Sequence, residues 1–130
     1  KHFFLLNTHL DAGRNTSDLK ARANQLKQIV TKVRKEIAGE ALIVAGDLNL
    51  YWEDPKDRAL LEAFEKDLGL MNSFKGVQKE REWPILDYIL YRNGKRTTLE
   101  ILETGEDQAF QNDAGPLSDH PALFMRLLIY

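Results

Sequence analysis

Hydrophobic and polar positions follow two different periods along the chain, and together these periods predict an α/β fold. Segment 2–9 (HFFLLNTH) opens with consecutive apolar residues, which is typical of a strand covered on both faces. Between residues 19 and 37, apolar positions recur every three or four residues, as on one face of a helix. The short apolar run 41–45 (ALIVA) predicts a second strand, parallel to the first through a right-handed crossover.

Capping residues indicate where the helices begin and end. Thr16 or Ser17 can accept hydrogen bonds from the first amides of the first helix, and Gly39 suits the left-handed position after it. Asp54-Pro55 predicts the start of a second helix that ends before Gly69.

The last third of the chain reads as strands. Segment 85–91 (ILDYILY), the turn Asn93-Gly94 and segment 97–102 (TTLEIL) predict an antiparallel hairpin. The polar stretch 103–116 predicts a loop, and 122–129 (ALFMRLLI) a final strand. We therefore expect a mixed sheet.

Five strands with apolar residues on both faces are matched by two helices, so we expect both helices on one face of the sheet. An uncovered apolar face marks an interface. The expected partner is another sheet, from a missing portion of the domain or from a second copy of the chain.

Composition narrows the function only slightly. The chain has 130 residues, no cysteine and a net charge of −2, so nucleic acid is a possible but disfavoured partner. Its apolar runs are too short to span a membrane. The chain begins with Lys1 directly before a strand, and we interpret it as a cut chain. The cellular compartment stays undecided.

Polar side chains gather where the predicted strands end, which is where ligands bind in open α/β sheets. They are His9, Asp47, Asn49, Asp119 and His120. Four of them also have a structural interpretation: Asp47, after Gly46, as part of a turn, His9 as a satisfied histidine, Asn49 as a turn residue, and Asp119 as a cap. Trp52 either lines a substrate rim or staples the next helix.

Asp87 interrupts an apolar strand, where an unpaired carboxylate would be costly, so it needs a partner. His120 is the natural candidate, because a carboxylate fixes the tautomer of an imidazole and raises its basicity. A structural ion pair with Arg92 or Lys95 is the alternative.

Four motifs, in this order, resemble the endonuclease/exonuclease/phosphatase superfamily, also called DNase I-like. They are NTHL at 7–10, GDLN at 46–49, LDYIL at 86–90 and SDHPAL at 118–123. The sequence NTHLDA followed by segment 21–29 (ARANQLKQI) is most similar to the neutral sphingomyelinase-like branch. The resemblance implies a four-layered α/β sandwich, with residues 1–130 as the C-terminal half of the domain and the N-terminal half absent.

The resemblance also implies roles for individual residues. His9 would contact the scissile phosphate, Asn49 would hold a phosphoryl oxygen, and Asp47 would orient or deprotonate the attacking water. His120 and Asp87 would form a dyad. The implied ligands for Mg²⁺ or Mn²⁺ are Asp119, Asp47 and Asn49, together with a Glu from the absent half.

We therefore expect the parent enzyme to hydrolyse a phosphodiester with Mg²⁺, either a phospholipid head group or a small phosphodiester, and this chain to be inactive alone. Two alternatives stay open: a nuclease acting on DNA or RNA, and a non-catalytic half-domain that acts as a binding or scaffold module.

Overall fold

A four-stranded mixed sheet forms the centre of the molecule. The structure is a computed structural model and describes residues 1–74 and 85–130. The strands are β1 (Phe4–Asn7), β2 (Leu42–Asp47), β3 (Met71–Asn72) and β4 (Asp87–Arg92), in the spatial order β1-β2-β4-β3. β1 is parallel to β2, and β4 is antiparallel to both of its neighbours.

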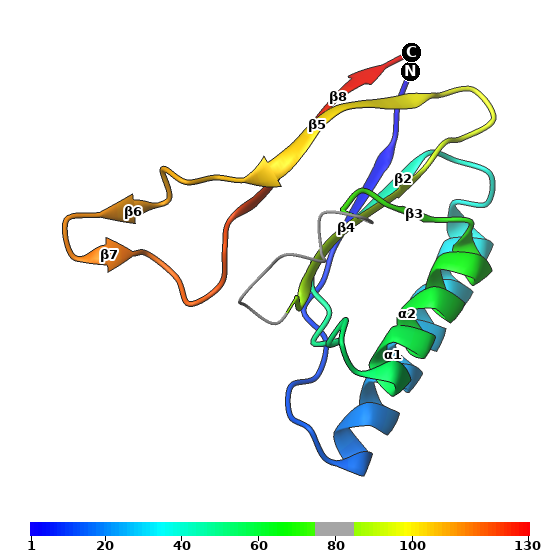
Figure 1. The fold of residues 1–130 in the computed structure, drawn as a ribbon. Coiled ribbons are helices and arrows are strands. Elements are labelled where there is room, and N and C mark those ends of the chain that lie inside the picture. Colours follow the sequence, from blue (N-terminus) through cyan, green and yellow to red (C-terminus); the bar gives the residue numbers. More distant parts are fainter. Residues whose placement is uncertain (75–84) are drawn as a thin grey trace.

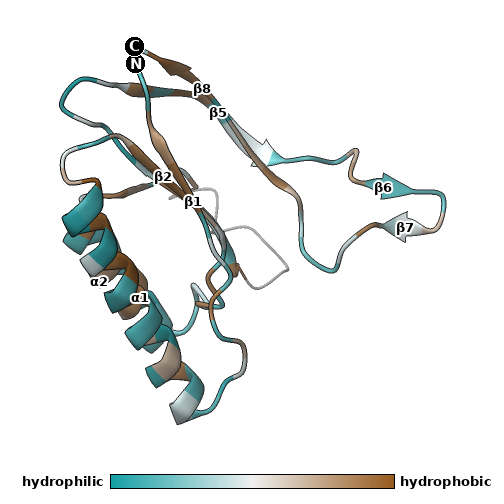
Figure 2. Ribbon diagram, turned by 180° about the vertical axis from the view of Figure 1, so that it is seen from behind, coloured by the Kyte–Doolittle hydropathy of each residue, from teal (hydrophilic) through white to brown (hydrophobic). Residues whose placement is uncertain are grey.

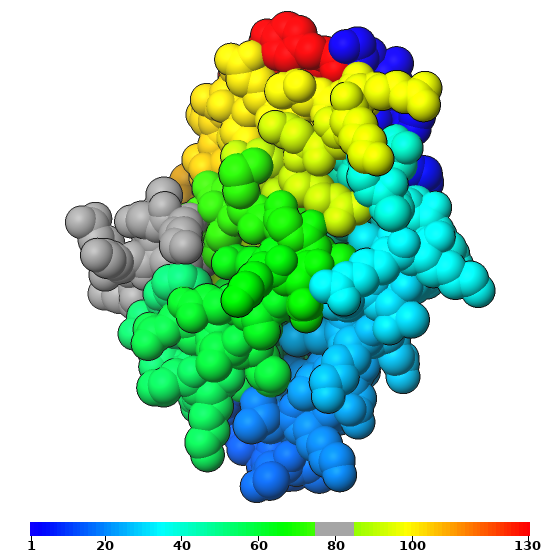
Figure 3. All heavy atoms as spheres, turned by 90° about the vertical axis from the view of Figure 1, so that its right-hand side faces the viewer, coloured from blue at the N-terminus to red at the C-terminus, as the bar shows by residue number. Residues whose placement is uncertain are grey.

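Both helices, α1 (Thr16–Glu36) and α2 (Pro55–Leu68), pack on the same face of this sheet (Figure 1). They lie side by side and form the outer surface of that layer in Figure 3. Residues such as Leu26, Leu61 and Leu90 are buried between the helices and the sheet. The expected α/β fold with helices on one face is confirmed.

Capping interactions explain where the two helices begin and end. Asn15, and not Thr16 or Ser17, caps α1, because its side chain and that of Asp18 exchange hydrogen bonds with each other's backbone amides. For α2 the predicted caps are confirmed. Asp54 accepts from the first amides, and Gly69 has the left-handed φ of 66°.

A second layer covers part of the opposite sheet face. β5 (Leu99–Glu106) pairs antiparallel with β8 (Leu123–Ile129), and the pair lies across the four-stranded sheet from the helices (Figures 1 and 2). Leu99, Met125 and Leu127 pack against Ile43 of β2. The chain thus supplies some of the cover that we expected from a missing part or a partner.

The predicted hairpin between 85–91 and 97–102 is wrong, because β4 and β5 belong to different sheets. A Cβ atom on Gly94 would lie 2.3 Å from the Ala41 nitrogen, so this glycine allows a close backbone approach to the start of β2. The amide of Lys95 donates to the Gly39 carbonyl (2.9 Å). These contacts carry the chain across to the second layer instead of folding it back.

The predicted loop at 103–116 is also partly wrong. β5 continues to Glu106 after a register shift between Ile101 and Glu103, which is the kind of irregularity that breaks side-chain alternation. Two short strands, β6 (Gln111–Asn112) and β7 (Gly115–Pro116), then form a hairpin that extends away from the two sheets (Figure 1).

Several large apolar side chains nevertheless remain exposed. Leu5 on β1 is 63% exposed and Leu102 on β5 is 51% exposed, although segment 2–9 was predicted to be covered on both faces. Leu128 and Ile129 on β8 are exposed as well, at 44% and 42%. No helix within the described ranges is long and apolar enough to cross a membrane.

Candidate active site

The ends of β1 and β2 lie close enough to bring two of the motifs together. Leu10 donates its amide to the Asp47 carbonyl (2.9 Å), and Thr8 donates to Ala45 (3.1 Å). A Cβ atom on Gly46 would lie 1.9 Å from the Thr8 carbonyl oxygen. The glycine of the GDLN motif is therefore required for this close approach.

Asp47 and Asn49 form a turn directly after β2. Asn49 has a positive φ of 50°, which asparagine tolerates better than most residues. Its amide donates to Asp47 Oδ1 (2.8 Å), and its side-chain Nδ2 donates to the Leu10 carbonyl (2.9 Å). The Asn49 side chain is therefore held against the segment that carries His9.

Asp87 begins β4 directly opposite Asp47 in the strand register. His120, on the loop before β8, forms a hydrogen bond with it that joins His120 Nδ1 to Asp87 Oδ2 (2.6 Å). The same Nδ1 atom lies 3.9 Å from Asp47 Oδ2. The contact between Asp87 and His120 leaves the Nε2 atom of the imidazole as its second functional nitrogen.

His9 approaches the same carboxylate from the end of β1. Its Nε2 atom lies 3.5 Å from Asp47 Oδ2, and its side chain is 71% exposed. The structure therefore brings His9, Asp47, Asn49, Asp87 and His120 to one end of the four-stranded sheet. Two imidazoles and two carboxylates, open to solvent on the His9 side, can bind an anion and transfer a proton.

Two pKa shifts accompany this geometry. The hydrogen bond to Asp87 raises the pKa of His120 above its ordinary value, and the carboxylates of Asp47 and Asp119 act in the same direction. Burial raises the pKa of Asp87, against the opposing effect of His120. Such shifts at a cluster of titratable groups are typical of functional sites.

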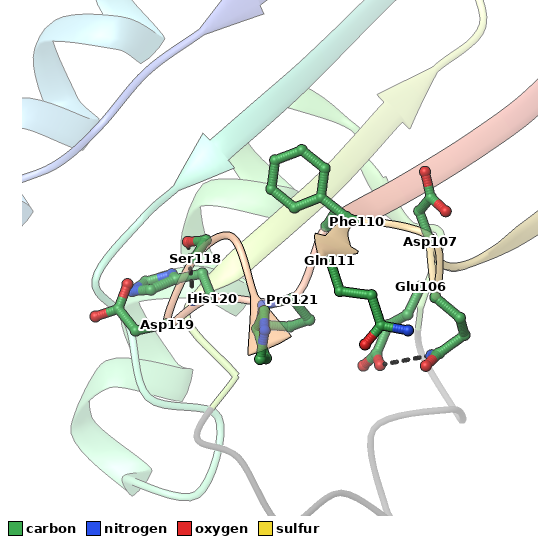
Figure 4. A pocket seen from close by; sticks show the side chains of 11 residues that line it. Glu106, Asp107, Phe110, Gln111, Ser118, Asp119, His120 and Pro121 are labelled. Carbon is green, nitrogen blue, oxygen red and sulfur yellow. Dashed lines mark hydrogen bonds between the residues drawn. The ribbon is translucent and has the colours of Figure 1, made fainter. Parts of the chain in front are cut away.

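Asp119 lies beside His120 but is exposed and outside the group of closely spaced ligand atoms at Asp47, Asp87 and His120. Both residues line a cleft of about 510 Å³. In Figure 4 they lie on one side of the cleft. Glu106, at the end of β5, and Phe110, just before β6, lie on the opposite side. The cleft extends the site beyond the two imidazoles.

The donor atoms fit a hard cation in part. Asp47, Asp87 and His120 each offer one ligand atom, and these atoms lie within 4.8 Å of one another. Carboxylate oxygens suit Mg²⁺, which usually takes one or two of them together with waters and substrate phosphate. Since His120 Nδ1 is bonded to Asp87, the two carboxylates are the better ligands here.

The structure excludes one alternative partner of Asp87. Arg92 donates to three backbone carbonyls, those of Ile37, Glu40 and Leu68, and not to Asp87. Trp52 is partly buried against the hydrophobic core, and the Arg58 guanidinium lies 5.9 Å from the centroid of its ring. His2 lies 3.1 Å from Glu40 at the other end of β1, away from the candidate site.

Sequence reasoning missed two buried charged residues near the site, Arg22 and Asp57. The spacing of both residues along their helices would have predicted that they are buried. Arg22 shares the spacing of buried Leu26, Val30 and Val33, and Asp57 shares that of the buried face of α2.

Comparisons with known proteins agree with the fold. No protein family model matches the chain. Its sequence is 30% identical to a sphingomyelinase of Mycobacterium tuberculosis, in a region that covers 73% of this chain and 22% of that protein. The catalytic domain of human Nocturnin, determined with a bound sulfate anion, has a TM-score of 0.70 at 23% identity, covering 98% of this chain and 47% of that chain.

An endonuclease/exonuclease/phosphatase protein of Beutenbergia cavernae has a TM-score of 0.68 at 18% identity, covering 95% of this chain and 35% of that chain. The chain has the endonuclease/exonuclease/phosphatase fold. The expected DNase I-like architecture is thus confirmed. The chain spans about a fifth of the sphingomyelinase and about half of the Nocturnin domain.

Proposed function

We propose that the protein containing this chain hydrolyses a phosphodiester with the help of Mg²⁺, and that its substrate carries a phospholipid head group. The observation that carries the proposal is the hydrogen bond between His120 and Asp87 beside Asp47 and His9. The similarity to a protein named sphingomyelinase supports the choice of substrate.

His120 is the proposed general base. Asp87 holds its Nδ1 atom and fixes the tautomer in which Nε2 accepts a proton. Nε2 takes a proton from water as the water oxygen forms a bond to phosphorus. The bond between phosphorus and the leaving oxygen breaks, and the leaving oxygen takes a proton from solvent water, which reaches the site on the open His9 side.

The remaining residues orient the phosphate and the water. His9 donates a hydrogen bond to a phosphoryl oxygen. Asn49 Nδ2 does the same with its second hydrogen, since its first is donated to the Leu10 carbonyl. Asp47, with Oδ2 near both imidazoles, orients the attacking water. The cleft beside His120 accommodates the part of the substrate beyond the phosphate.

Mg²⁺ would be held by Asp47 and Asp87, with Asn49 and Asp119 as the further ligands expected from the motifs, and would neutralise charge on the phosphate. Two carboxylates are few ligands for a strongly hydrated ion. We therefore also propose that residues outside this chain complete the site and that residues 1–130 form the C-terminal part of a larger catalytic domain.

The test uses the full-length protein with three substrates, namely sphingomyelin in vesicles, a chromogenic small phosphodiester, and DNA, each with Mg²⁺ or with a chelator. We expect Mg²⁺-dependent release of phosphocholine from sphingomyelin. If DNA is the only one of the three substrates that is cleaved, the proposed substrate class changes from phospholipid to nucleic acid. Absence of turnover with all three substrates would contradict the proposed activity and favour a non-catalytic module.

A further inference from the structure

We propose that Arg22 and Asp57 are positioning residues, which hold the loops carrying His9 and Asn49 in the geometry that the reaction requires. This inference rests on the proposed function for its kinetic test. Neither residue belongs to the group of side chains that would contact the substrate. Their role follows from what they connect.

Both side chains are almost completely buried, Arg22 at 1% and Asp57 at 2% exposed. They lie near the N-terminal ends of α1 and α2, at the same end of the molecule as the candidate site. A charged group is normally removed from water only when it is paired and hydrogen-bonded. The partners of these two residues are therefore informative.

Arg22 binds the loop that follows His9. Its Nη1 atom donates to the carbonyls of Asp11 (3.1 Å) and Gly13 (2.8 Å), and its Nη2 atom donates to Asp57 Oδ1 (3.5 Å). Asp11 is two residues after His9. One guanidinium thus joins the His9 loop to α2.

Asp57 binds the loop that follows Asn49. Its Oδ2 atom accepts a hydrogen bond from the Tyr51 amide (3.0 Å), two residues after Asn49, and another from Arg14. The guanidinium of Arg14 also stacks on the Tyr51 ring, 3.9 Å from the ring centroid. A continuous set of polar contacts, with the buried Arg22–Asp57 pair at its centre, therefore runs from one site loop to the other.

Two further contacts tie the same loops together. Gln25, one turn beyond Arg22 on α1, accepts from the Asp11 amide (2.9 Å), and Asn49 Nδ2 reaches Leu10. The His9 segment is thus held from α1 and from the GDLN turn at once. A purely structural ion pair between the two helices would not need these backbone partners in both loops.

The geometry requires arginine specifically. A lysine at position 22 keeps the charge, but a single ammonium cannot reproduce the planar fork that reaches two carbonyls and a carboxylate. Small displacements of reacting groups, of about 1 Å, can lower rates by about 10²-fold. We therefore expect Arg22→Lys to lower kcat by at least tenfold with a smaller change in KM.

The matched control is Arg92→Lys. Arg92 is half-buried and, like Arg22, makes three hydrogen bonds through its guanidinium, in this case to three backbone carbonyls. It lies at the opposite end of β4 from Asp87. Both variants are made in the full-length protein and assayed well below their melting temperatures. Arg92→Lys should lose stability while keeping its kcat, and an equal loss of kcat in both variants would overturn the proposal.

A double variant separates positioning from folding. Arg22→Met together with Asp57→Asn removes both buried charges, so its stability should recover relative to Arg22→Met alone. The Asp11 and Gly13 carbonyls remain unheld, so kcat should stay low. Recovery of kcat together with stability would show that the pair acts only through folding.

Hydrogen exchange gives a readout that does not depend on turnover. In Arg22→Lys, backbone amides of residues 9–14 and 47–52 should exchange faster than in wild type, whereas in Arg92→Lys they should not. Unchanged exchange in Arg22→Lys would refute the positioning role. Faster exchange in a protein whose wild type hydrolyses no phosphodiester would refute the proposed function and leave the positioning role supported.

Discussion

Asp87 illustrates how far a single residue can be predicted. A carboxylate in an otherwise apolar strand must have a partner, and His120 was the expected one. The structure contains this hydrogen bond at 2.6 Å. The pairing could be predicted although the two residues are far apart along the chain, because a carboxylate within an apolar run of sequence indicates that a partner is required.

Arg22 and Asp57 were harder to predict, although the same argument applied to them. On a helix, a charged residue in the buried register is easily assigned to the solvated face, since long side chains often reach past the helix edge. Only the tertiary structure reveals that the partners of Arg22 are backbone carbonyls in the loop after β1. Backbone acceptors have no sequence signature.

Removing the proposed general base, or the carboxylate proposed to orient the water, should lower the rate strongly. We expect His120→Ala and Asp47→Asn in the full-length protein each to reduce kcat by about 10²–10⁴-fold, the usual contribution of a positioned acid or base. The measurement is steady-state hydrolysis of a chromogenic phosphodiester. Asp67→Asn, which removes an exposed carboxylate paired with Arg34, is the control. Retained rates in both site variants would contradict the assignment.

The pH dependence of kcat should report His120. A base must be unprotonated to act, and the hydrogen bond to Asp87 raises the pKa of His120, so activity should rise with pH through a midpoint above about 6.5. Asp87→Asn removes the main cause of the shift. Its acidic limb should therefore move to lower pH while its maximal kcat falls. An unmoved limb would mean that another group is titrating.

At the scale of elements, local signals predicted α2 well and the strand pairing poorly. Asp54, Pro55 and Gly69 act within one turn of chain, so their effects can be read directly from sequence. The pair Asn93-Gly94 has the composition of a hairpin turn. In the structure, however, Gly94 is needed for a close contact with Ala41, which lies far away along the chain.

Gly69 offers a clean test of helix termination. Its φ is 66°, and a Cβ atom there would meet nothing within 4 Å, so Gly69→Ala should cost only backbone strain, about 1 kcal/mol in the free energy of unfolding. Gly69→Asn should lose less, because asparagine tolerates this conformation. Chemical denaturation of the full-length protein measures both. Equal stability of all three proteins would contradict the expected strain.

At the scale of the whole molecule, the imbalance between strands and helices predicted the layers in outline. The helices cover one face, as expected, and the β5–β8 pair covers part of the other. Strand counting could not show that the C-terminal strands form a separate layer. Leu5, Leu102 and Leu128 remain exposed, and we propose that residues outside this chain cover them.

The last prediction concerns the activity of the chain alone and the covering of these exposed side chains. We expect residues 1–130 alone to be inactive toward a chromogenic phosphodiester in millimolar Mg²⁺, because two carboxylates hold a strongly hydrated ion weakly. Mixing the chain with the proposed remainder of the catalytic domain should restore turnover. Association would bury the exposed side chains, at about 25 cal/mol per Å² of apolar area removed from water.

A matched variant separates association from ligand supply. Leu5→Asp places a charge in the exposed apolar surface of β1, away from the residues proposed to contact substrate. It should weaken restoration of activity by raising the concentration of partner required, while activity at saturating partner stays near that of wild type. Turnover by the unmixed 130-residue chain would mean that its own residues complete the metal site, and the proposal that it is part of a larger catalytic domain would then be wrong.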